Sequence, residues 1–253
     1  MLSTSLRLSV ATKTARRARN GAAQTNGRAR YIELDPEYTE TWRLDAVVDL
    51  IKGGGVGIIP TDSFPSFVCD LGNRGAVQKL YELKQITASK PLSILCRNLQ
   101  DVSTYTLGFP VSRTPGQPDV FKIAKRVLPG PYTFILHASK ELPKQVTNFT
   151  SGRSKQRTTV GVRVPDCPVC QYILEQLDRP LLCSTAKGED GEALPDAAVL
   201  VDLYGPRGLD FIVDTGFGGS RDVEETTVLD LTGVEPLLVR EGKGDASLFV
   251  GSE

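Results

Sequence analysis

Hydrophobic positions alternate between helical and strand-type spacing from about residue 43 onward. Helical spacing covers residues 44–51, ends at three consecutive glycines, and returns at 77–84 and 169–177. A short amphipathic stretch after Asn98, a good capping residue, predicts one more helix. Apolar runs predict strands at 56–60, 91–96, 132–137, 159–164, 181–184, 211–214, 226–231 and 236–239. Strands interleaved with helices predict an α/β or α+β fold in which helices pack on a sheet.

The composition narrows the class of protein. A chain of 253 residues that is 40% hydrophobic and 24% charged is long enough to bury a core. No apolar run approaches the roughly 18 residues of a membrane span, so we expect no membrane partner. One histidine and five cysteines argue against a multi-ligand zinc site, and we expect no protein metal site. The odd cysteine count favours a reducing compartment.

The zero net charge conceals an uneven distribution. Residues 1–32 hold seven basic side chains and no acidic one, which leaves 23 basic and 30 acidic side chains in residues 33–253. An acid-free segment rich in arginine and hydroxyl residues is typical of an organelle transit peptide, for a chloroplast or a mitochondrion. The alternative is a disordered basic arm that touches nucleic acid, in a cytoplasmic protein. The acidic remainder does not predict tight non-specific binding to a phosphate backbone.

Polar residues follow the strand at 56–60. Thr61, Asp62 and Ser63 stand at its carboxyl end, where open α/β sheets bind ligands, although a simple turn explains them equally well. Further on, Lys84 and Lys90 flank a helix end and a strand start. Lysines there suit phosphate or carboxylate binding, or they complement the helix dipole.

Later strands add further candidates. Arg163 lies inside an apolar strand, where its charge needs a partner: an anionic ligand or a buried acidic side chain. The strand at 181–184 breaks into a loop with Ser184, Thr185 and Lys187, again at a carboxyl end. His137 is the single histidine, and without a Gly-x-Ser-x-Gly motif we discount Ser/His hydrolysis.

Cys167 and Cys170 have the spacing of a redox pair. A single Cys-x-x-Cys is weak evidence, and no second pair of metal-ligand spacing accompanies it. The residues after Pro165 have the pattern of an ordinary helix start. Structural thiols are therefore the favoured interpretation.

Six motifs in order resemble the YrdC-like superfamily, which includes the threonylcarbamoyl-adenylate synthases. They are Pro-Thr-Asp at 60–62, Glu-Leu-Lys at 82–84, Lys-Pro at 90–91, Pro-Gly-Pro-x-Thr at 129–133, Val-x-Val-Arg-Val at 160–164 and Thr-Thr-Val-Leu-Asp at 226–230. Residues 95–105 and 239–245 look most like the YciO branch. The resemblance implies one α/β domain over 43–244, with a twisted open sheet, flanking helices and a large concave cavity. Residues 33–42 would lead into it, and 245–253 would form a tail.

The resemblance also implies an activity. L-threonine, bicarbonate and ATP would give threonylcarbamoyl-AMP and pyrophosphate for tRNA modification, with Mg²⁺ arriving on the nucleotide. The alternative is a YciO-like protein that binds double-stranded RNA or a nucleotide, with little or no synthase activity. RNA or tRNA is thus an expected partner in either case.

The resemblance assigns roles to ten residues. Lys84 and Lys90 would be catalytic and neutralise the triphosphate, and Thr61 would contact threonine. The remaining substrate-binding and nucleotide-binding residues would be Thr133, Arg163, Ser184, Thr185, Lys187, Thr227 and Arg240. The sequence departs from the synthase pattern at three places: Ile86 replaces the arginine of Lys-x-Arg, Thr185-Ala186-Lys187 replaces Ser-x-Asn, and Pro65-Ser66 replaces an aromatic-Gly pair.

Overall fold

The structure is a computed structural model that describes residues 29–35, 37–87, 90–111, 119–147, 158–188, 192, 196–216 and 223–250. Residues 1–28, most of the segment with a transit-peptide composition, lie outside the described residues. Its targeting role therefore stays a prediction. None of the helices in the described ranges is long and apolar enough to cross a membrane.

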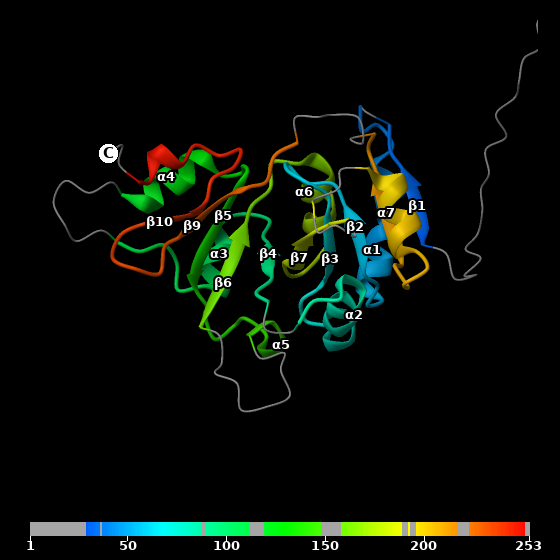
Figure 1. The fold of residues 1–253 in the computed structure, drawn as a ribbon, viewed down its shortest axis with the longest axis horizontal. Helices are drawn as coiled ribbons and strands as arrows, with labels where there is room; N and C mark the ends of the chain where they lie inside the picture. The colour runs from blue at the N-terminus through cyan, green and yellow to red at the C-terminus, as the bar shows by residue number, and fades with distance from the viewer. Residues whose placement is uncertain are drawn as a thin grey trace, which may run out of the picture.

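The described strands form one mixed sheet (Figure 1). In spatial order they are β1 (Arg30–Glu33), β8 (Phe211–Asp214), β2 (Gly57–Ile59), β3 (Ser66–Asp70), β7 (Leu181–Thr185), β4 (Ser93–Leu95), β6 (Thr159–Arg163), β5 (Tyr132–His137), β9 (Thr227–Asp230) and β10 (Leu237–Arg240). Parallel pairs (β1–β8, β2–β8, β4–β6, β5–β9) are joined by antiparallel ones. The predicted α/β sheet fold is thereby confirmed.

Seven α-helices of the described ranges cover this sheet. They are α1 (Asp45–Lys52), α2 (Arg74–Lys84), α3 (Leu99–Tyr105), α4 (Val120–Val127), α5 (Lys144–Thr147), α6 (Pro168–Glu175) and α7 (Ala197–Tyr204), with 3-10 turns η1 (Thr41–Leu44) and η3 (Ala246–Leu248). Asn98 caps α3 as predicted, because its side chain accepts hydrogen bonds from the amides of Gln100 and Asp101.

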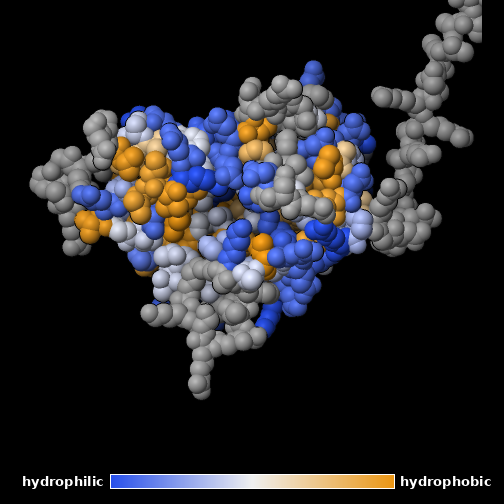
Figure 2. All heavy atoms as spheres, viewed as in Figure 1, coloured by the Kyte–Doolittle hydropathy of each residue, from blue (hydrophilic) through white to orange (hydrophobic). Residues whose placement is uncertain are grey.

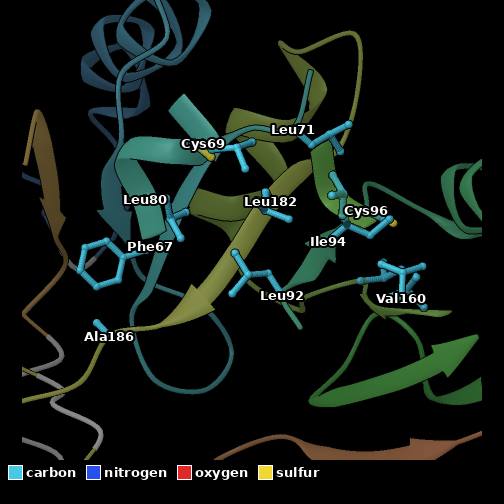
Figure 3. Close-up of a cluster of buried hydrophobic side chains, with 14 of the residues drawn as sticks. Phe67, Cys69, Leu71, Leu80, Leu92, Ile94, Cys96, Val160, Leu182 and Ala186 are labelled. Carbon is cyan, nitrogen blue, oxygen red and sulfur yellow. The ribbon is translucent and has the colours of Figure 1, made fainter. Parts of the chain in front are cut away.

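Both faces of the central strands are buried. Neighbouring side chains alternate between two hydrophobic clusters, as Phe67 and Val68 do on β3. One cluster contains the apolar faces of α2 and α7, and the other contains those of α1 and α6. Figure 3 shows part of the first cluster, where Phe67, Ile94 and Leu182 project from three strands beside Leu80. Such burial on two faces explains why these strands are apolar runs without polar alternation.

Both ends of the predicted domain extend further than the sequence suggested. Arg30–Ile32, which we placed in the disordered segment 1–32, belong to β1 and pair with β8. Phe249, which we placed in the tail, is buried against Tyr132 and Phe134. Ile32 is buried as well, so each extension covers apolar surface at an end of the sheet.

Hydrophobic side chains also lie at the surface. Figure 2 shows them gathered over the side of the molecule that holds α4, β9 and β10. Phe121, Leu237 and Val239 are exposed there. Leu237 and Val239 belong to β10, the edge strand of the sheet.

The aromatic cluster around Phe134 gives a first prediction. Phe134 is fully buried, and its ring contacts the ring of Phe109. Phe121 is exposed, and it also contacts the Phe109 ring. Phe134→Ala should lower the free energy of unfolding by about 3–5 kcal/mol, because it leaves a cavity in the core. Phe121→Ala should cost about 1 kcal/mol or less. Urea denaturation of both variants checks this, and equal losses would contradict it.

Candidate functional site

A cavity of about 610 Å³ is lined by residues of strands β4, β5, β6, β7, β9 and β10 and of the segments beside them. Eight of the ten predicted site residues line it: Lys84, Lys90, Thr133, Arg163, Ser184, Thr185, Lys187 and Arg240. Lys84 belongs to α2, Lys90 to the loop before β4, and Lys187 to the loop after β7. The other five belong to strands β5, β6, β7 and β10. Thr61 and Thr227 lie nearby but do not line the cavity. The sheet thus brings together side chains that are up to 156 positions apart in the sequence.

Lys84 forms the cationic wall of the cavity together with Lys90 and Lys187. It is the last residue of α2, which ends there because Gln85 adopts a left-handed conformation with φ of 51°. Its Nζ donates a hydrogen bond to the Thr185 carbonyl oxygen and lies 4.8 Å from the centre of the Phe67 ring. Within the described ranges, no carboxylate lies within ion-pair distance of Lys84 or Lys90.

The environment of Lys84 disfavours its charge. Burial, reinforced by the charges of Lys90 and Lys187, lowers the pKa of Lys84 from its ordinary value to about 7. The neutral amine is therefore accessible near neutral pH. An anionic ligand in the cavity would favour the ammonium form, so binding would be accompanied by proton uptake.

Ser184 and Thr185 end β7 in the middle of the sheet. Thr185 pairs with Ser66 of β3, and its carbonyl oxygen accepts the bond from Lys84. The lysine is thus attached to the strand end that carries the two hydroxyls. Ile86 packs against the hydrophobic core. Where the resemblance leads us to expect an arginine, this chain therefore has a partly buried apolar side chain that packs against the core.

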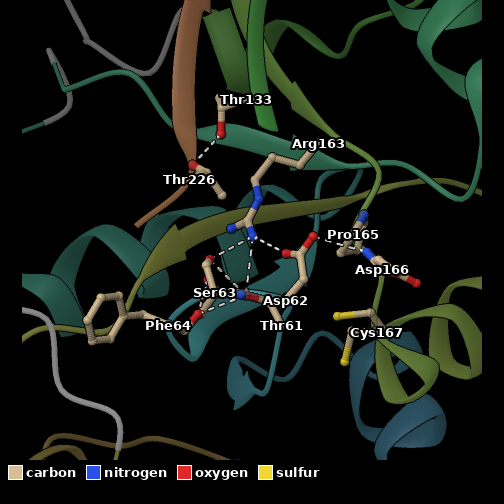
Figure 4. Close-up of polar contacts among 12 residues, drawn as sticks. Thr61, Asp62, Ser63, Phe64, Thr133, Arg163, Pro165, Asp166, Cys167 and Thr226 are labelled. Carbon is tan, nitrogen blue, oxygen red and sulfur yellow. Dashed lines mark hydrogen bonds and ion pairs between the residues drawn. The ribbon is translucent and has the colours of Figure 1, made fainter. Parts of the chain in front are cut away.

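Arg163 is buried and ion-paired with Asp62. Its Nη2 donates to Asp62 Oδ1 at 2.8 Å, to Ser63 Oγ at 2.9 Å and to Thr61 Oγ1 at 3.2 Å (Figure 4). Of the two partners that the sequence allowed for Arg163, the internal acid is therefore present. Thr61 contacts Arg163 instead of the cavity. The Nε of Arg163 is buried without a hydrogen-bond partner among the described residues, so one donor beside the cavity is left over.

Arg240 lies on the opposite wall and is also paired. Its Nη1 lies 2.6 Å from Glu225 Oε2, and its Nε and Nη2 donate to the Thr226 carbonyl oxygen. The hydroxyl of Thr226 is 2.8 Å from that of Thr133. We expected Thr227 to line the cavity here. The hydroxyl of Thr227 instead donates to the Gly244 carbonyl oxygen in the protein interior. Successive side chains of a strand point to opposite faces, so the cavity threonine is Thr226.

Several lining residues escaped the sequence reasoning. Glu225 and Thr226 lie directly before β9. Thr226 belongs to the motif at 226–230, but the site role in that motif was assigned to Thr227. Apolar side chains also line the cavity, namely Leu92, Ile135, Val160, Val228 and Val239. Alternation along β9 could have identified Thr226 and Val228 as one face, whereas Val239 and Arg240 both line the cavity beside a register shift in β10. The cavity therefore combines a cationic wall with an apolar surface.

The family model described as telomere recombination, which joins Sua5, YciO and YrdC, matches residues 49–242. The chain belongs to this family. The YciO protein of Escherichia coli K12 is 28% identical over 88% of this chain and 100% of its own length. Its crystal structure superposes with a TM-score of 0.72 and covers the same shares of the two chains. An uncharacterized protein of Haemophilus influenzae is 30% identical over 88% of this chain and 100% of its own.

Synthases of the family are similar as well. The threonylcarbamoyl-AMP synthase of Pyrococcus abyssi is 27% identical over 81% of this chain. The matched region is 56% of the length of that synthase. The crystal structure of P. abyssi Sua5 with L-threonine superposes with a TM-score of 0.68 at 25% identity, over 84% of this chain and 57% of that one. Relatives of this chain therefore include threonylcarbamoyl-AMP synthases as well as YciO proteins.

The two arginine–carboxylate pairs predict different effects on stability. Asp62→Ala leaves the buried guanidinium of Arg163 without its counter-charge and should lower the free energy of unfolding by about 3–5 kcal/mol. Glu225→Ala breaks a pair whose side chains are 38% and 31% exposed, so we expect a loss of about 0–1 kcal/mol. Chemical denaturation of both variants measures the two losses. Similar losses would show that burial does not determine how much each ion pair contributes to the free energy of unfolding.

The lowered pKa of Lys84 predicts a dependence of stability on pH. Folded Lys84 loses its proton near pH 7, whereas an unfolded lysine keeps it until about pH 10.4. Between these values the unfolded state binds more protons at this residue, so Lys84 contributes a rise in the free energy of unfolding with pH. Lys84→Met should remove this rise, and Lys52→Met, at an exposed position on α1, should keep it. Urea denaturation between pH 7 and 8, below the range in which unfolded cysteines release their protons, tests the difference, and parallel curves for all three proteins would contradict it.

Proposed function

We propose that the cavity binds ATP and L-threonine and forms threonylcarbamoyl-AMP with release of pyrophosphate. The observation that supports this most is the convergence of Lys84, Lys90 and Lys187 with the hydroxyls of Ser184 and Thr185 in one cavity. Such a wall suits a triphosphate, whose negative charge must be neutralised during nucleotidyl transfer. Membership of a family that includes threonylcarbamoyl-AMP synthases supports the same reaction.

The proposed reaction has a defined balance. The threonine amine and bicarbonate give a carbamate with loss of water, and a carbamate oxygen then bonds to the α-phosphorus of ATP. The bond from this phosphorus to the bridging oxygen breaks, and pyrophosphate leaves. Lys84 and Lys90 stabilise the charge that develops on the leaving group. Lys84 takes up a proton as the phosphates bind, because their charge favours its ammonium form.

The other walls suit the remaining parts of the substrates. Arg163 lines the cavity, where its guanidinium charge would attract the threonine carboxylate. Thr61, assigned to threonine by the sequence, acts through Arg163 by holding its guanidinium. The apolar surface of Val228 and Val239 accommodates the adenine ring.

Magnesium fits this proposal as part of the nucleotide. Within the described ranges, no three His, Cys, Asp or Glu side chains gather to hold a metal ion. Glu225 lines the cavity, but its carboxylate is bound to Arg240. Mg²⁺ would therefore be held mainly by phosphate oxygens and water, where it neutralises phosphate charge. The lysines bind and orient the same phosphates.

Release of pyrophosphate by the full chain tests the proposed function. With ATP and Mg²⁺, we expect release that requires both L-threonine and bicarbonate. Lys84→Met should lower the rate about 10²–10³-fold, the cost of removing one preorganised electrostatic contact. Lys52→Met, which keeps the net charge of that variant, should have the wild-type rate.

The same experiment separates the alternative function. ATP that binds without release of pyrophosphate would contradict synthase activity. It would favour the nucleotide-binding or RNA-binding interpretation, with Ile86 in place of a phosphate-binding arginine as its simplest cause. RNA binding that weakens steeply with salt would then be the next observation to seek.

A further inference from the structure

Cys167 and Cys170 form a buried pair of thiols at the start of α6, and the proposed reaction does not use them. Cys167 is the N-cap residue of this eight-residue helix, Pro168 follows at its first position, and Cys170 lies one turn further on. Both cysteines are free thiols and nearly inaccessible to solvent. Figure 4 shows the Cys167 side chain beside the turn that contains Asp62.

The two thiols share one acceptor. The carbonyl oxygen of Pro60 lies 3.0 Å from Cys170 Sγ and 3.7 Å from Cys167 Sγ. Both thiols therefore point toward one oxygen atom, from positions one turn apart at the start of the same helix. A Cys-x-x-Cys pair at a helix N-terminus is an arrangement in which the first sulfur becomes a nucleophile and the second resolves its product.

The pKa values of the two thiols agree with these roles of nucleophile and resolving sulfur. The Cys170 thiol and the backbone amides at the start of α6 hold the pKa of Cys167 below its ordinary value, despite burial. The hydrogen bond with Cys167, together with burial, raises the pKa of Cys170. Burial also raises the pKa of the remaining cysteines, Cys69, Cys96 and Cys183. Cys167 is thus the cysteine best able to react as a thiolate.

We propose that Cys167 and Cys170 are a redox-active dithiol that hydrogen peroxide converts to a disulfide. The Cys167 thiolate attacks one peroxide oxygen, the O–O bond breaks, and sulfenic acid and hydroxide form. The Cys170 sulfur then attacks the Cys167 sulfur and displaces the hydroxyl, which leaves as water with the Cys170 proton. Two thiols and one peroxide give one disulfide and two waters, so the electrons balance. Cys167, at 4% exposure, is the more accessible of the two thiols, so it is the one that meets peroxide first.

Oxidation also affects the turn that holds Arg163. The Pro60 carbonyl oxygen loses both thiol donors when the disulfide forms. Thr61, Asp62 and Ser63, the partners of Arg163, follow Pro60 directly. The amide of Asp166, next to Cys167, donates to Asp62 Oδ2 at 3.0 Å. The dithiol and the residue before it therefore contact this turn at Pro60 and Asp62, and oxidation loosens the turn.

Counting thiols in the full chain after peroxide treatment and denaturation tests the disulfide. Wild type should fall from five thiols to three and return to five with dithiothreitol. Cys69→Ala, a buried cysteine outside the pair, should fall from four to two, whereas Cys167→Ala and Cys170→Ala should not lose two thiols. A wild-type count that stays at five, or a paired loss in Cys167→Ala, would overturn the proposal. The wild-type count decides even if a variant does not fold.

Hydrogen–deuterium exchange tests the effect on the turn. Amides of residues 61–64 should exchange at least several-fold faster in the oxidised wild type than in the reduced protein. Peroxide-treated Cys167→Ala should match its untreated form. Equal exchange in oxidised and reduced wild type would overturn the coupling between dithiol and turn. Neither measurement depends on synthase activity, so each can fail separately from the proposed function.

Discussion

The buried guanidinium of Arg163 constrains the centre of this molecule. A charge in the protein interior is costly unless it is paired and hydrogen-bonded, so its partners must be brought to it. Those partners, Thr61, Asp62 and Ser63, lie about a hundred positions away in the sequence, at the carboxyl end of β2. The ion pair therefore fixes the turn after β2 against the end of β6, and the cavity opens beside this contact.

Pairing of the arginines determines the charge of the cavity. Arg163 is matched by Asp62, and Arg240 by Glu225. The lysine wall is different, because Lys84 and Lys90 have no carboxylate at ion-pair distance among the described residues. Burial of Lys84 near two other cations makes its charge unfavourable until an anion arrives. The positive potential that a phosphate would meet thus comes from the lysines.

Much of the fold and site follows from local sequence patterns. Lys84, Arg163 and Ser184 were identifiable because each lies at the end of a strand or helix, or inside an apolar run where charge is costly. The choice between Thr226 and Thr227 was different, since it depends on which face of β9 meets the cavity. Strand β1 also gave no signal, because its pairing with β8 is set by residues about 180 positions away. The pKa of Lys84 depends on Lys90 and Lys187, which only the folded sheet brings near it.

The turn from Pro60 to Phe64 lies between two kinds of chemistry. On one side its hydroxyls and carboxylate hold Arg163 at the cavity, and on the other the Pro60 carbonyl oxygen meets the thiols of Cys167 and Cys170. Arg163 and Cys167 are only four positions apart, so β6 and the start of α6 reach both sides of this turn. A displacement of α6 relative to β2 would therefore reach Asp62 through the Asp166 amide, and Arg163 through Asp62. The Pro60 carbonyl oxygen and the Asp62 carboxylate belong to this one short turn. Through them, the redox state of the dithiol is linked to the position of the Arg163 guanidinium.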